Sequence, residues 1–144
     1  MTLRDCAPAD ASAAPGLVQP GFVVATPRLI LRLEGLAALA VALAEYQHLG
    51  GSWAAFAALF LAPDLAMLGY LAGPRVGAMA YNAAHGYVGA AALGGVGVAS
   101  GSPPMIQIAL IWAAHIGFDR LLGYGLKYAS AFGDTHLGRV GKAA

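Results

Sequence analysis

The chain has 144 residues, of which 59% are hydrophobic and only 10% are charged, and its formal net charge is +1. A mean hydropathy of +0.68 is more than the surface of a small soluble domain tolerates, so the composition excludes that class and predicts an integral membrane protein. Nucleic acid is excluded as a partner, because the few basic residues are spread along the chain and form no basic patch.

Residues 1–27 are predicted to form a disordered or interfacial N-terminal tail. This stretch is rich in proline and lacks the basic start and central apolar run of a secretory signal. Its Cys6 is the single cysteine of the chain, so no internal disulfide can form.

Four apolar runs follow, and each approaches the ~20 residues that a helix needs to cross a bilayer. Short loops rich in Gly, Ser and Pro join them, so consecutive helices are expected to run antiparallel. The sequence therefore predicts an all-α fold, an integral membrane four-helix up-down bundle over residues 28–125, followed by a cytoplasmic interfacial segment over residues 126–144. The predicted helices are Leu29–Leu49, Trp53–Leu71, Val76–Val98 and Met105–Leu122.

The distribution of basic residues predicts the orientation. In this topology every Lys and Arg belongs to the side that holds both termini, and the two opposite loops carry none. The positive-inside rule places that side in the cytoplasm. We therefore expect a multi-pass protein of the inner (plasma) membrane, surrounded by lipid, with both termini cytoplasmic. The basic residues are Arg4, Arg28, Arg32, Arg75, Arg120, Lys127, Arg139 and Lys142.

Each predicted helix carries polar or ionisable side chains that hydrocarbon should exclude. A charge at the centre of a helix costs about 2.5–3.5 kcal/mol on insertion scales, so such groups indicate a functional site by default. With a rise of about 1.5 Å per residue, most of them fall in one band roughly 8 Å tall in the cytoplasmic half. Glu45 and His48 lie near the opposite boundary, where they can reach water. The band contains Glu34, Asp64, Asn82, His85, His115 and Asp119.

Helical spacing predicts which faces point inward. On the first helix, a narrow stripe at positions i, i+4, i+7, i+11 and i+14 carries Glu34, Glu45 and His48, and we expect it to face the bundle. Pro63 lacks a backbone donor and predicts a kink beside Asp64. Two further pairs are one turn apart and share a face: His115 with Asp119, and Tyr81 with His85.

Two interpretations of this band stay open. In the first, it binds a divalent metal (Zn, Fe or Mn), because histidines and carboxylates from several helices are ligands that these ions use. The ligands are then His85, His115, Asp64 and Asp119, with Glu34, Asp64 and Asp119 as catalytic candidates and Asn82, Tyr81 and Arg120 as supporting residues. In the second, the band is a metal-free hydrogen-bonded network in which Arg32 and Arg120 neutralise Glu34 and Asp119.

Several blocks of sequence together form a specific pattern: Arg32-Leu-Glu-Gly35, Ala62-Pro-Asp-Leu65 with Gly69-Tyr70, Tyr81-Asn82 with His85, Trp112-Ala-Ala-His-Ile-Gly-Phe-Asp-Arg120, Gly123-Tyr-Gly-Leu-Lys-Tyr128 and Asp134-Thr-His-Leu-Gly138. Through them, the stretch from Arg32 to Gly141 resembles a family of small bacterial membrane proteins, the domain of unknown function 4260. The resemblance implies the four-helix fold and supplies no reaction. It adds His136 to the candidate metal ligands, because Asp134 and His136 could fold back over the band as a lid.

Three classes of function fit these observations. The leading hypothesis is a metal-dependent membrane hydrolase or oxidase that acts on a lipid-like substrate. The alternatives are a small ion- or proton-coupled transporter, whose buried acids and histidines relay protons, and a structural or assembly subunit, whose polar band fixes the register of the helices. The substrate, the reaction and the choice between a monomer and a homo-oligomer stay open.

Overall fold

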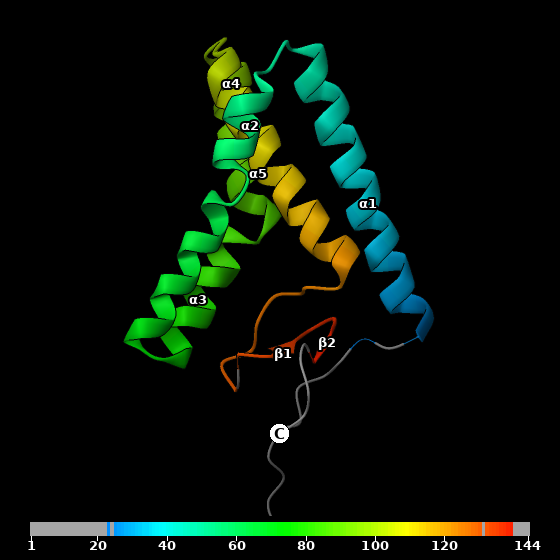
Figure 1. The fold of residues 1–144 in the computed structure, drawn as a ribbon, viewed down its shortest axis with the longest axis vertical. Helices are drawn as coiled ribbons and strands as arrows, with labels where there is room; N and C mark the ends of the chain where they lie inside the picture. Colours follow the sequence, from blue (N-terminus) through cyan, green and yellow to red (C-terminus); the bar gives the residue numbers. More distant parts are fainter. Residues whose placement is uncertain (1–22, 24, 131, 140–144) are drawn as a thin grey trace, which may run out of the picture.

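The computed structural model describes residues 23, 25–130 and 132–139, and most of these residues are helical (Figure 1). The chain passes along the molecule four times in alternating directions, and we call each pass a leg: residues 25–48, 53–72, 74–99 and 103–122. This arrangement confirms the predicted all-α fold with four packed helices. The predicted tail, including Cys6, lies mostly outside the described residues. The elements are α1 (Ala25–His48), α2 (Trp53–Leu59), the 3-10 helix η1 (Ala62–Ala72), α3 (Pro74–Ala84), α4 (Tyr87–Ala99), α5 (Pro103–Leu122), β1 (Asp134–Thr135) and β2 (Gly138–Arg139).

The helix α5 is central and packs against α1 and α4, whereas η1 packs mainly against α3. Glycines make the α1–α5 contact close. A Cβ added to Gly35 would lie 2.5 Å from the Cβ of Arg120, and one added to Gly117 would lie 2.7 Å from the Gly35 carbonyl oxygen. Small residues at a helix crossing let the two backbones approach, so this contact fixes how α1 is rotated against α5.

The inward face of α1 differs from the predicted one. Its buried residues are Gly35, Ala42 and Tyr46. The ionisable residues of the predicted stripe are instead exposed: Glu34, Glu45 and His48. The prediction is therefore wrong by one residue, which is a rotation of about 100°. The cause is steric, because the contact with α5 accepts only glycine at position 35 and so turns the neighbouring Glu34 outward.

The second apolar run was expected to form a helix with a kink at Pro63, and the structure divides it there into two helices. The run stops as α2 at Leu59 and resumes as η1 at Ala62. Pro63 lies in the first turn of η1 and has no N–H with which to continue the hydrogen bonds of α2. The kink predicted at Pro63 is thus confirmed, and it places Asp64 at the start of the second half of this leg.

The third apolar run is also broken, at His85 and Gly86 between α3 and α4. Two carbonyl groups at the break accept hydrogen bonds from side chains of α5. Trp112 Nε1 donates to the Ala84 oxygen at 2.5 Å, and Arg120 Nη2 donates to the His85 oxygen at 2.9 Å. A helix can be interrupted inside a bundle when its backbone groups find partners in this way, so α5 supports the break.

After Gly123, which ends α5 with φ +96°, the chain folds back between the lower ends of α1 and α3 (Figure 1). There β1 and β2 pair in antiparallel fashion. The buried Asp134 accepts hydrogen bonds from Arg139 Nε and Ser130 Oγ, both at 2.8 Å, and these bonds hold the pKa of its carboxyl below the usual range. Asp134 therefore ties this C-terminal segment together.

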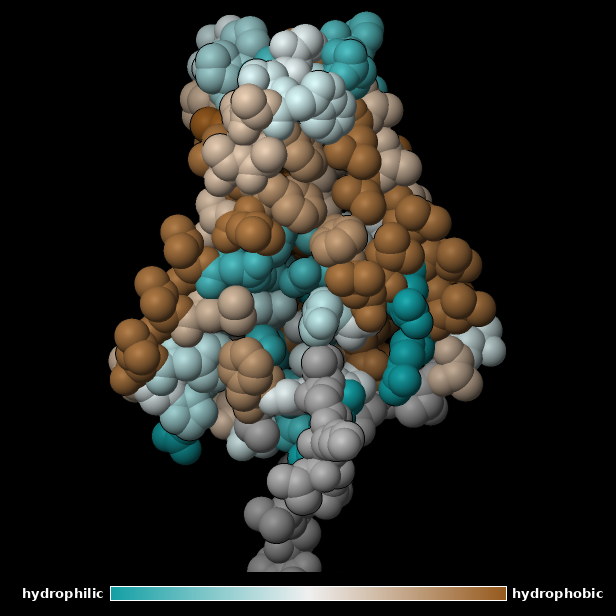
Figure 2. Space-filling view, viewed as in Figure 1, coloured by the Kyte–Doolittle hydropathy of each residue, from teal (hydrophilic) through white to brown (hydrophobic). Residues whose placement is uncertain are grey.

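Large hydrophobic side chains are exposed along the outer faces of the legs, and many of them are more than half exposed, among them Leu29, Val41, Leu65, Leu71 and Val88. Figure 2 shows hydrophobic residues over both flanks, with hydrophilic residues at the two ends and in the centre of this face. Two helical stretches, Trp53–Ala72 and Pro103–Leu122, are long and apolar enough to cross a membrane. Large exposed apolar patches are typical of surfaces that contact another protein, a ligand or a membrane.

Candidate metal centre

Four of the predicted site residues converge between the second, third and fourth legs. Asp64 comes from the first turn of η1, His85 from the end of α3, and His115 and Asp119 from consecutive turns of α5. Both histidines are buried, both aspartates are half-buried, and one ligand atom from each lies within 4.8 Å of the other three. We call these residues the His/Asp cluster.

The distances within the His/Asp cluster suit a small metal ion. His85 Nε2 lies 3.3 Å from Asp64 Oδ1 and 3.6 Å from Asp119 Oδ2. His115 Nε2 lies 3.6 and 4.0 Å from the same two oxygens, and 3.2 Å from His85 Nε2. A tetrahedral ion with bonds of about 2.0–2.1 Å needs ligand atoms about 3.3–3.4 Å apart. The four residues could therefore hold a metal ion once their ligand atoms, which lie within 4.8 Å of one another, draw closer together.

Each histidine presents the nitrogen that a metal ligand needs. His85 Nδ1 lies 2.9 Å from the Tyr81 carbonyl oxygen, which can only accept, so Nδ1 carries the proton. In the neutral ring, the lone pair of Nε2 is then directed at the cluster. His115 also turns its Nε2 inward, and its buried Nδ1 has no hydrogen-bond partner among the described residues.

The two aspartates are held differently. Asp119 Oδ2 accepts a hydrogen bond from the Tyr81 hydroxyl at 3.1 Å, and the Tyr81 ring stacks on His85 with the ring centroids 3.7 Å apart. The Asp119 side chain is 13% exposed, whereas that of Asp64 is 31% exposed. Asp119 is therefore a fixed member of the cluster, and Asp64 is the more accessible one.

A cavity of about 240 Å³ opens on both carboxylates, and Lys127 brings a cation to its wall. Lys127 is 8% exposed, and its Nζ donates to the Phe132 carbonyl oxygen at 2.9 Å. The same Nζ lies 3.7 Å from the ring centroid of Phe132. Burial lowers the pKa of Lys127, while the nearby carboxylates oppose this shift. The cavity is lined by Asp64, Met67, Tyr81, Asp119, Tyr124, Lys127, Phe132 and Gly133.

Asn82, a predicted supporting residue, fixes the backbone of Lys127. Its Nδ2 donates to the Lys127 carbonyl oxygen at 2.9 Å, and its Oδ1 accepts from the Lys127 N–H at 2.7 Å. Because both bonds go to the main chain, they position Lys127 without using its ammonium group. Asn82 thus acts on the site through a residue of the C-terminal segment.

The two arginines that were expected to neutralise Glu34 and Asp119 direct their hydrogen bonds elsewhere. In the described part of the chain neither forms an ion pair, and both donate to backbone oxygens. Arg32 Nε donates to Leu121 at 2.7 Å, and Arg120 donates to Tyr124 at 2.7 Å as well as to His85. Carbonyl groups near the end of a helix lack helical partners and attract cations, which explains why both arginines donate to backbone oxygens.

Glu34 and His136, two further predicted site residues, lie outside the His/Asp cluster. Both line a separate cavity that also contacts Arg120, and Glu34 is exposed. His136 Nδ1 accepts a hydrogen bond from the Leu126 N–H at 2.8 Å. Burial and the charge of Arg120 lower the pKa of His136. His136 therefore serves the C-terminal segment as a neutral acceptor.

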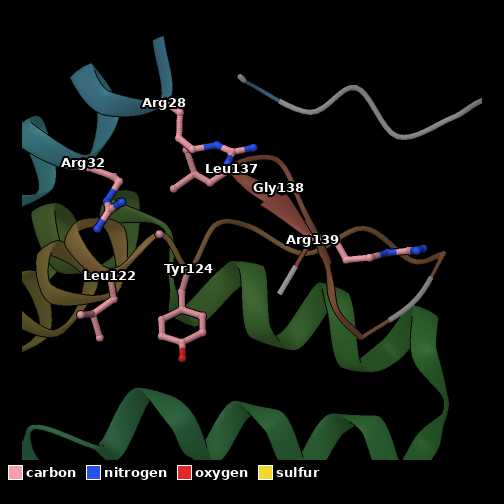
Figure 3. A pocket seen from close by; sticks show the side chains of 8 residues that line it. Arg28, Arg32, Leu122, Tyr124, Leu137, Gly138 and Arg139 are labelled. Atoms are coloured by element: carbon pink, nitrogen blue, oxygen red, sulfur yellow. The ribbon is translucent and has the colours of Figure 1, made fainter. Parts of the chain in front are cut away.

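Another cavity, of about 270 Å³, lies where the start of α1 meets the C-terminal segment (Figure 3). Three arginines line it, and each already donates a hydrogen bond. Arg28 Nε donates to the Val23 oxygen at 3.0 Å, Arg32 to Leu121, and Arg139 to Asp134. We therefore assign these arginines to the packing of the two segments.

Lys127, Tyr124 and Phe132 line the cavity beside the cluster, and none of them is among the residues predicted for the site. The depth of a residue can be counted only within a helix, and these three residues lie beyond the end of the last helix. The available signal was the block Gly123–Tyr128 among those that carry the family resemblance. Lys127 and Phe132 of this segment line the cavity, whereas Asp134 and His136, which were predicted to form a lid, do not.

The fold and the site together define the class: a small helical protein with a buried His/Asp cluster that could hold a metal ion. The particular family follows from comparison with known families. Residues 28–140 match the Domain of unknown function (DUF4260), and the chain belongs to that family, as the resemblance predicted. No curated protein and no solved structure matches the chain.

Proposed function

We propose that the His/Asp cluster is the divalent metal centre of a membrane enzyme that acts on a lipid-like substrate. The convergence of the four side chains carries the proposal, since their ligand atoms lie within 4.8 Å of one another. Two carboxylates this close repel each other when both are ionised, and a shared divalent cation removes that repulsion. The inward Nε2 atoms supply the remaining ligands.

Within this centre, we assign His85, His115 and Asp119 as fixed ligands and Asp64 as the exchangeable ligand. The support is that Tyr81 holds Asp119, whereas Asp64 is more exposed and faces the cavity. A catalytic zinc-type site keeps one position for water or substrate, where the ion acts as a Lewis acid and activates water. Asp64 is then placed to serve as a general base in a hydrolysis.

The membrane location is supported by the surface. Hydrophobic side chains cover the flanks of the legs, and two helical stretches have the length and composition of membrane spans. The start of α1, the turn between η1 and α3, and the C-terminal segment all lie at one end of the molecule (Figure 1). These parts carry the basic residues, so the positive-inside rule favours the cytoplasm for that end.

Metal analysis of the full chain, purified in detergent under anaerobic conditions without chelators, tests the proposal. We expect about one divalent ion per chain, as a single four-ligand site requires. His115→Ala should lose the ion, and His48→Ala is the matched control because His48 is exposed on α1. Thermal unfolding checks that both variants are folded. A wild-type chain without stoichiometric metal, or a folded His115→Ala variant that retains it, would contradict the proposal.

A further inference from the structure

We infer, on the basis of the proposed metal centre, that the cavity beside the cluster binds an amphiphile with an anionic head group. Lys127 would hold this head group against the centre. The observation behind the inference is a buried lysine in the wall of the same cavity that exposes Asp64 and Asp119. Such an amphiphile would be the substrate of the proposed enzyme.

The charges around the cavity favour an anion. Asp64 and Asp119 bring two negative charges, which a divalent ion balances, and histidine ligands are neutral. Lys127 then remains as an uncompensated cation, and among the described residues it forms no ion pair. Buried charges in proteins are normally paired, so the site lacks one anionic group.

The ammonium of Lys127 has the capacity to bind that group. It carries three donors, and the hydrogen bond to the Phe132 oxygen uses one of them. Asn82 fixes its backbone on both sides of the residue and the Phe132 oxygen holds its amine, so the amine is preorganised. Met67 and Phe132 line the cavity beside it, and they suit an apolar chain attached to the head group.

The test uses the zinc-loaded full chain in an uncharged detergent and calorimetric titration with four probes of equal chain length. Hexyl phosphate and hexanoate are anionic, hexanol is neutral and hexylammonium is cationic. We expect an anion to bind, and the neutral and cationic probes to bind at least tenfold more weakly. The ratio between hexyl phosphate and hexanoate distinguishes a phosphate from a carboxylate head group.

Lys127→Gln should weaken binding of the anion by about 10- to 100-fold, the effect of one charge-assisted hydrogen bond, with the zinc content unchanged. Arg75→Gln is the matched control, because Arg75 is a cation at the turn between η1 and α3 and does not line the cavity. Removal of zinc should also weaken binding of the anion at least tenfold, since the negative charges of the two carboxylates are then uncompensated.

The failures can be told apart. If the wild-type chain holds no zinc, the proposed metal centre fails before any probe is added, and the inference falls with it. If zinc is present but hexanol binds as tightly as the anions, or Lys127→Gln binds them as tightly as the wild type, the inference alone is overturned.

Discussion

Tyr81 acts on two candidate ligands at once. Its hydroxyl donates to Asp119, its carbonyl oxygen accepts from His85 Nδ1, and its ring stacks on the His85 imidazole. One residue thus sets the rotamer of a carboxylate and the tautomer and ring plane of a histidine. Partners of this kind fix the orientation of metal ligands and raise their basicity.

Tyr81→Phe removes only the hydroxyl, so the stacking and the backbone bond to His85 remain. We expect the affinity for zinc to fall by about 10- to 100-fold, as for other lost partners of metal ligands. Competition with a chromogenic chelator measures this. Tyr70→Phe is the control, because the buried Tyr70 hydroxyl has no hydrogen-bond partner among the described residues. An equal loss in both variants would show that the Asp119 contact is irrelevant.

His136 should make stability depend on pH. Its pKa is lowered from the ordinary value of 6.5 in the folded chain, mainly by burial. Between the lowered pKa and about 6.5, the unfolded chain binds more protons at this residue than the folded chain does. The free energy of unfolding therefore falls as the pH falls through this window. Above the window, His136 causes no loss of stability. His136→Asn keeps an acceptor for the Leu126 N–H and cannot titrate.

We therefore expect a shallower pH dependence of the unfolding midpoint in His136→Asn than in the wild type between about pH 5 and 7. His48→Asn, at an exposed position, should leave the wild-type slope unchanged. Identical slopes in His136→Asn and the wild type would rule out this role for His136.

Depth along a helix is one coordinate of a side chain, and the direction around the helix is the other. The depth of a side chain could be counted from the sequence, and this count correctly placed Asp64, His85, His115 and Asp119 at one level. The second depends on packing. For Glu34 it was wrong, because Gly35 is the residue that fits against α5 and consecutive residues differ by about 100°.

At the scale of elements, the close contact between α1 and α5 can be tested by substituting one of its glycines. Gly117→Ala places a methyl group against the Gly35 oxygen, so we expect a loss of about 1–3 kcal/mol in the free energy of unfolding, typical of overpacking. Gly95→Ala in α4 meets nothing within 4 Å and should be neutral or slightly stabilising. Unfolding in a denaturing detergent compares them. Equal stability of both variants would contradict the contact.

The two broken legs show how far local sequence determines an element. Pro63 predicts the first break, because the missing N–H is a property of that residue alone. The break at His85 and Gly86 lies within an apolar run and depends on Trp112 and Arg120, which are 28 and 35 residues away from their acceptors. Interactions of that range are invisible to helical periodicity, so the run was predicted as one helix.

At the scale of the whole molecule, the proposed orientation can be measured by cysteine labelling. In a Cys6→Ser background, Ser100→Cys lies in the α4–α5 loop and Ala129→Cys in the C-terminal segment, and both positions are exposed. We expect an impermeant maleimide to label position 100 in intact spheroplasts and position 129 only after permeabilisation. The reverse pattern would overturn the orientation, and labelling of both in intact spheroplasts would contradict a membrane barrier between them.

The central position of α5 also determines when the site can exist during synthesis. This helix supplies two of the four candidate ligands and both side-chain donors at the break between α3 and α4, and Lys127 follows it. While the ribosome is still completing α4, the nascent chain offers only Asp64 and His85 to an ion. Two ligands hold a divalent ion poorly, so the metal would be acquired only after translation of α5.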